Sequence, residues 1–129
     1  MTILSNFNNQ LTDLVSQLSD MYPEDSNIFA FKQTLLILLK TNAKKSLEYF
    51  SLYVYIYKNE IMKEDESFFK NGIDYETLNE NYVPNLNNII DILKLKWDEM
   101  NDKCKQNIWK YFKVLIIFKE QYDNSKFNI

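Results

Sequence analysis

The chain has 129 residues, the length of one domain, and 46% of them are hydrophobic, so it can bury a core without disulfide or metal support. Its net charge is −3 and all fifteen basic residues are lysines, which excludes bidentate guanidinium recognition of phosphate and disfavours a general nucleic-acid binder. It has no histidine and only one glycine, which excludes imidazole-based catalysis, histidine-ligated zinc, glycine-rich phosphate loops and the many tight turns of an all-β domain.

The segment 3–22 is predicted to be an amphipathic helix. Its apolar residues alternate spacings of three and four and therefore share one face: Leu4, Phe7, Leu11, Leu14, Leu18 and Met21. Pro23 ends this helix, because a proline pushes the residue before it out of helical backbone angles. The N-terminus has no basic segment followed by an apolar run, so no signal peptide is expected.

A second helix is predicted over 26–41. Residues 24–27 offer several N-cap side chains, and their acidic groups suit the positive end of the helix dipole. The run 35–39 is apolar on every face, so the second half of this helix is predicted to lie at the centre of the protein. Asn42 ends the helix, either in a left-handed conformation or as the cap of the next helix.

Residues 43–63 show two competing patterns. Helical spacing relates one set of apolar residues: Leu47, Phe50, Val54, Tyr57 and Ile61. The run 52–57, however, is β-branched and aromatic, as a strand would be. Because a lone strand would have no pairing partner elsewhere in the chain, we predict a helix. Tyr49, Tyr53 and Tyr55 would then project off its inward face, some of them into solvent.

The middle of the chain is the least regular. Residues 63–72 are predicted to form a helix end or short helix closed by Gly72, and residues 73–84 a loop with one turn at most. A fourth major helix is predicted over about 85–100. Its apolar residues again follow helical spacing: Leu86, Ile89, Ile90, Leu93, Trp97 and Met100.

A fifth helix follows a cap at Asn101 or Asp102, and the other helices are predicted to surround it. Its inward face comprises Cys104, Ile108, Tyr111 or Phe112, Leu115, Phe118 and Tyr122. The apolar run 114–118 is too short to span a bilayer, which needs about 20 residues, and suits a helix end covered on all sides. Residues 123–129 are predicted to be a frayed tail. Residues 1–129 are thus predicted to be one all-α domain, a compact bundle of five main helices with one or two short ones.

Few side chains could perform chemistry, and we predict a protein that is not an enzyme and holds no cofactor and no metal. Cys104 lies between two lysines at the start of a helix, which could activate its thiol, but its place on the apolar face favours a packed thiol. The carboxylates of Glu64, Asp65 and Glu66 could approach a divalent ion. Adjacent helical residues point apart, however, which favours a solvated acidic turn.

Lysines are concentrated in the last third of the chain. Between residues 91 and 123 there are seven: Lys94, Lys96, Lys103, Lys105, Lys110, Lys113 and Lys119. Six carboxylates in the same segment nearly balance them, which favours an ordinary solvated face over a weak nucleic-acid patch. Nucleic acid is therefore not the partner we expect.

Three segments together resemble a group of small α-helical proteins from nucleocytoplasmic large DNA viruses. They are P-E-D-S at 23–26, D-E-S-F-F at 65–69, and W-D-E-M at 97–100 continuing to N-I-W-K-Y-F-K-V-L at 107–115. The likeness covers roughly residues 7–118. It implies a viral origin, which agrees with the AT-rich coding bias toward Asn, Lys, Ile, Tyr and Phe. The group has no assigned activity, so the resemblance transfers no functional residue.

The aromatic excess favours a binding function. Tyr and Trp are enriched at interface hot spots, and five of them exceed what a narrow inward face needs: Tyr49, Tyr53, Tyr55, Trp109 and Tyr111. The alternative is that these aromatics fill the core. We expect a protein partner or a homo-oligomer, and no membrane span.

The first functional hypothesis is therefore a non-catalytic helical interaction or structural module of a large DNA virus, associated with the virion or the viral factory. The alternatives are a host-modulating groove binder of the Bcl-2 type and a weak nucleic-acid accessory protein. The expected location is intracellular, in the host cytoplasm or the viral factory, or packaged in the virion.

Overall fold

The computed structural model of the protein describes residues 2–70, 90 and 92–127. Within these ranges the chain is helical apart from short connections and has no strand, which confirms the predicted all-α class. Residues 90 and 92–96 are helical, and the remaining elements are α1 (Ile3–Met21), α2 (Ser26–Thr41), α3 (Ala43–Tyr53), η1 (Tyr55–Tyr57), α4 (Lys58–Met62), α5 (Ser67–Lys70), η3 (Trp97–Glu99) and α7 (Asp102–Phe127).

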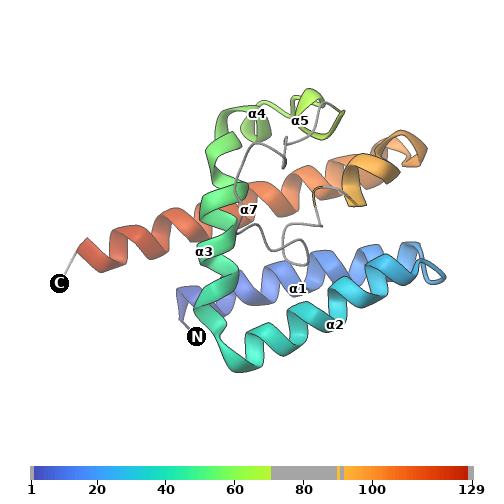
Figure 1. The fold of residues 1–129 in the computed structure, drawn as a ribbon. Helices are drawn as coiled ribbons and strands as arrows, with labels where there is room; N and C mark the ends of the chain where they lie inside the picture. Colours follow the sequence, from blue (N-terminus) through green and yellow to red (C-terminus); the bar gives the residue numbers. More distant parts are fainter. Residues whose placement is uncertain (1, 71–89, 91, 128–129) are drawn as a thin grey trace, which may run out of the picture.

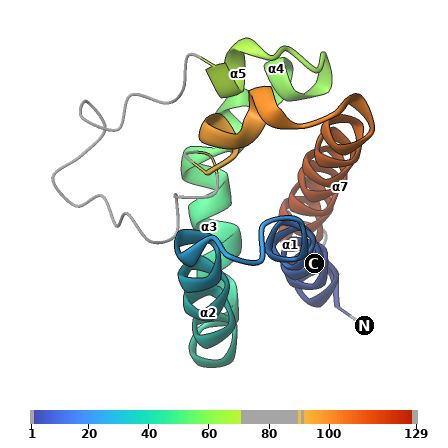
Figure 2. The same cartoon turned by 90° about the vertical axis from the view of Figure 1, so that its right-hand side faces the viewer.

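Three long helices lie side by side, with α1 between α2 and α7 and antiparallel to both (Figure 1). α3 crosses this layer steeply and contacts α1 and α2. The view along the layer separates α2 and α7 on the two sides of α1, with α4 and α5 at one end against α7 (Figure 2). The buried apolar side chains of the described residues form one core between these elements.

α1 forms as its sequence predicts. The Thr2 hydroxyl accepts a hydrogen bond from the Ser5 amide at 3.0 Å and caps the first turn. The centre of the predicted inward face is buried: Phe7, Leu11, Leu14 and Leu18. Tyr22, directly before Pro23, has φ −128° and ψ 65°, which ends the helix where predicted.

α2 also has the predicted bounds, but its second half is not central. Asp25 caps the helix by accepting from the amides of Asn27 and Ile28 at 2.9 and 3.1 Å. Within the run 35–39, Leu35 is buried whereas Ile37 is 63% exposed. The prediction of a helix covered on every face was wrong: among the described elements α2 packs against α1 and α3, and Ile37 remains exposed.

Residues 43–62 are helical, which settles the competing strand pattern in favour of helix. Val54 interrupts regular α-helix, and the chain continues through η1 into α4 without a loop. The predicted inward face is buried at Leu47, Phe50, Val54 and Ile61. Asn42 has φ −155°, which is extended and not left-handed, and its side chain makes no cap bond to α3.

A buried polar contact joins α1 to the start of α3. The Asn8 side-chain NH₂ group donates to the Ala43 backbone carbonyl at 3.0 Å, and the Ser46 hydroxyl donates to the side-chain oxygen of Asn8. Asn8 is 8% exposed and Ser46 5% exposed, so these groups satisfy one another away from bulk water. The contact therefore fixes how the first turn of α3 sits on α1.

The end of α4 adopts a glycine-type conformation without a glycine. Glu64 has φ +55°, the only positive value among the described non-glycine residues. The amides of Glu64 and Asp65 donate to the carbonyls of Ile61 and Glu60 at 3.0 and 2.9 Å, which is the Schellman arrangement of helix ends. The glycine predicted to close this region, Gly72, and the predicted loop 73–84 lie outside the described residues.

The short helix α5 falls inside the segment 63–72, where a short helix was predicted. Of the predicted helix 85–100, the described part is helical and turns into the 3₁₀ helix η3. Its inward residues are buried: Ile90, Leu93, Trp97 and Met100. Leu86 and Ile89 lie outside the described residues.

α7 is longer than predicted. Asn101 caps it by accepting from the Cys104 amide at 2.9 Å, as expected. The run 114–118 was predicted to be a helix end covered on all sides, yet Leu115 and Ile116 are fully buried while Ile117 is 45% exposed. The tail was predicted to fray from Asp123, but α7 continues to Phe127. The first prediction took the apolar run as the end of the helix, and the second placed that end at Tyr122.

Candidate functional site

The five candidate aromatics do not form one surface. Trp109 is only 3% exposed and packs edge to face on Trp97, with ring centroids 5.4 Å apart. It is a core residue, so its assignment to a binding face was wrong. The reason is rotational: Trp109 and Tyr111 are two positions apart on α7 and therefore point to different sides of the helix.

Two of the five, Tyr49 and Tyr53, lie together on α3. Their rings stack with centroids 6.3 Å apart and an interplanar angle of 19°. Both are half-buried, and the Lys45 ammonium lies 6.0 Å from the centroid of the Tyr49 ring. Half-buried stacked rings present a rigid surface to a partner at little cost in side-chain entropy.

Two aliphatic residues extend this aromatic pair, and the sequence interpretation did not single them out. Leu52 is 61% exposed and Ile56 58% exposed. Tyr49, Leu52 and Tyr53 stand at the spacing i, i+3, i+4 of one face of α3, and Ile56 follows them on η1; we call this set of four the α3 stripe. The sequence did contain a signal for this surface. If Leu47 and Phe50 face inward, helical spacing places the α3 stripe on the opposite side of the helix.

Tyr55 has a different role, because it ties η1 to α7. Its hydroxyl donates to the Glu120 carboxylate at 2.8 Å, and the Lys58 ammonium donates to the same oxygen at 2.5 Å. The Lys119 ammonium lies 4.3 Å from the centre of the Tyr55 ring. The hydrogen bond to Glu120 raises the pKa of Tyr55, and the Lys58 hydrogen bond lowers the pKa of Glu120. Tyr55 therefore stabilises the fold at this point.

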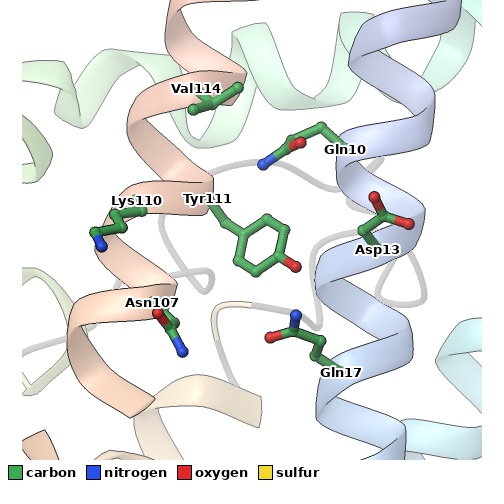
Figure 3. Close-up of a pocket in the computed structure, with 7 residues that line it drawn as sticks. All are labelled: Gln10, Asp13, Gln17, Asn107, Lys110, Tyr111 and Val114. Atoms are coloured by element: carbon green, nitrogen blue, oxygen red, sulfur yellow. The ribbon is translucent and has the colours of Figure 1, made fainter. Parts of the chain in front are cut away.

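Tyr111 lies in an open cleft of about 300 Å³ between α1 and α7 (Figure 3). The cleft is lined by three amides, a carboxylate, an ammonium, a phenol and one aliphatic group: Gln10, Gln17, Asn107, Asp13, Lys110, Tyr111 and Val114. The Tyr111 ring projects from α7 toward α1, with its hydroxyl between Asp13 and Gln17. Burial and the nearby Asp13 carboxylate raise the pKa of Tyr111, which keeps the phenol neutral. Such walls can exchange hydrogen bonds but offer little apolar surface.

A second cleft, of about 410 Å³, lies at the turn between α1 and α2. Lys96 joins its walls: its ammonium is 3.3 Å from the Asp25 carboxylate and 4.8 Å from the centre of the Tyr22 ring. The Ile28 amide and Lys96 lower the pKa of Asp25. The α1–α7 cleft has one aliphatic residue in its walls, and the second cleft is a short turn where Met21, Tyr22 and Pro23 lie beside charged groups, so neither is the long apolar groove that the Bcl-2-type hypothesis requires.

The acidic turn at 64–66 is held within the fold. The Glu64 carboxylate accepts from Lys113 at 2.5 Å, Asp65 accepts from the Ser67 amide at 3.0 Å, and Glu66 accepts from the Trp97 indole at 3.2 Å. Each carboxylate thus has a different partner. Among the described residues, no three Asp, Glu, Cys or His side chains gather in a group that could hold a metal ion.

Ion pairs engage several lysines of the C-terminal third. Lys96, Lys105, Lys113 and Lys119 each lie within 4.0 Å of a carboxylate, on Asp25, Glu66, Glu64 and Asp123 respectively. A nucleic-acid phosphate would have to displace those carboxylates to reach these ammonium groups, which weakens the electrostatic attraction that such binding requires. Cys104 is half-buried on the first turn of α7.

In the described ranges, no helix combines the length and the hydrophobicity that crossing a bilayer demands. Compared with known proteins, the chain matches no protein-family model and has no significant match among curated proteins or solved structures.

Proposed function

We propose that the protein is a non-catalytic helical module that binds another protein through the α3 stripe. The observation behind this proposal is the pairing of two largely exposed aliphatic side chains, Leu52 and Ile56, with the stacked rings of Tyr49 and Tyr53. Fully burying a leucine or isoleucine side chain stabilises by about 1.5–3 kcal/mol. A partner that covers the stripe would gain this free energy while meeting rings that are already ordered.

The α3 stripe is the better candidate than the exposed face of α2. On α2, Phe29 and Ile37 are 58% and 63% exposed, but Gln33 stands between them. Single exposed apolar residues are ordinary on a protein surface. The stripe is different because its four apolar or aromatic residues follow one another without a polar residue between them on that face.

A place in the virion or viral factory of a large DNA virus is the second part of the proposal, and the sequence resemblance supports it. In the fold, aromatic residues of the second and third segments of that resemblance pack against one another. The Phe68 and Phe112 rings lie 6.4 Å apart, and Trp97 contacts Trp109. The apolar residues of the second and third segments therefore contribute to the core, whereas residues 23–26 form a mostly exposed turn, and the α3 stripe is separate from all three segments.

The test is affinity capture from cells that make the tagged protein, using the double variant Leu52→Ser/Ile56→Ser. The matched control is Ile37→Ser, which removes an equally exposed aliphatic group from α2. We expect wild type and the control to retain the same bound proteins and the stripe variant to lose them, with all three proteins equally folded. Capture that survives the stripe variant, or that the control abolishes equally, would contradict the proposal.

A further inference from the structure

We draw no further inference here: the strongest candidate, the open cleft between α1 and α7 around Tyr111, is lined by one carboxylate, one ammonium and three amides that are all accessible to solvent, and nothing in the structure shows which class of ligand would occupy it.

Discussion

At the scale of single residues, Asn8 and Ser46 show how one polar contact can define the crossing of two helices. They lie 38 residues apart in sequence, on α1 and α3, and both are buried. Leaving a buried amide or hydroxyl group without a hydrogen-bond partner lowers stability by more than a formed hydrogen bond raises it on balance. Each of these two residues therefore stabilises the native packing mainly by giving the buried polar group of the other a hydrogen-bond partner.

We expect Ser46→Ala to reduce the free energy of unfolding by about 1–2 kcal/mol, because it leaves the side-chain oxygen of Asn8 without its hydroxyl donor. Asn8→Ala should cost a similar amount, since the Ala43 carbonyl loses the Asn8 donor and keeps the Ser46 hydroxyl, which lies 3.1 Å from it. The double variant should cost less than the sum of the two. Urea unfolding of wild type, the two single variants and the double variant measures this coupling. If the loss in the double variant equals the sum of the two single losses, the two side chains do not depend on each other.

Glu64 is the second residue-scale case, because its backbone conformation favours glycine. A side chain at positive φ costs about 1–2 kcal/mol relative to glycine. We expect Glu64→Gly to be more stable than Glu64→Ala by that amount, since both variants lose the contact with Lys113 and only the alanine keeps a Cβ. Thermal unfolding compares them directly. Equal stability of the two variants would mean that the turn relaxes out of the left-handed conformation.

At the scale of elements, two substitutions of Asp25 separate its role as the N-cap of α2 from the role of its negative charge. Asp25→Ala removes the acceptor for the amides of Asn27 and Ile28 and should reduce the free energy of unfolding by about 1 kcal/mol. Asp25→Asn keeps a good capping side chain and loses only the charge that faces Lys96. The asparagine variant should therefore be clearly more stable than the alanine variant in urea unfolding. Equal losses would point to the ion pair as the important contact.

The helices themselves were predictable where local signals agree. In α1, a hydrophobic face of regular spacing and a terminating proline gave bounds correct to one residue and a buried face that fails only at its end, where Met21 is exposed. In α2 the bounds were equally clear, but the run 35–39 contains no local signal of which side has neighbours. Ile37 is exposed because no described element packs on that side of α2, and this is decided by the arrangement of helices far away in sequence.

The candidate site was only partly predictable for the same reason. Spacing on α7 allowed either Tyr111 or Phe112 to face inward, and the fold buries Phe112 and leaves Tyr111 in the α1–α7 cleft. Trp109 was misassigned because its partner, Trp97, comes from a different element. Tyr49 and Tyr53 were expected off the inward face and are half-buried beside it, since Leu47 and Phe50 mark the buried side of α3.

At the scale of the whole molecule, stability should fall in acid. Among the described residues, four carboxyl groups have a pKa below the ordinary range. The main cause is the Ile28 amide for Asp25, the Lys113 ammonium for Glu64, the Ser67 hydroxyl for Asp65 and the Lys58 ammonium for Glu120. Because the native state binds protons less readily than the unfolded chain, their contribution is complete above the unfolded pKa of about 4 and is lost as the pH falls through the lower native values.

We therefore expect unfolding free energies that change little between about pH 7 and pH 5 and decline below about pH 4. Glu120→Gln should make this decline shallower, since it removes one of the four titrating groups while an amide oxygen remains for the Tyr55 hydroxyl. Urea unfolding across this pH series measures both effects. A decline of unchanged steepness in the variant would show that Glu120 does not contribute to the acid response.

The tryptophan pair has a practical consequence for every such measurement. Both indoles of the chain are buried and in mutual contact between η3 and α7, so the intrinsic fluorescence of the protein originates from one small region. Emission should be blue-shifted in the native state and should report the opening of that region alone. If α2 and α3 detach first, far-ultraviolet circular dichroism will change before the emission does; coincident transitions will show that the helices melt as one cooperative unit.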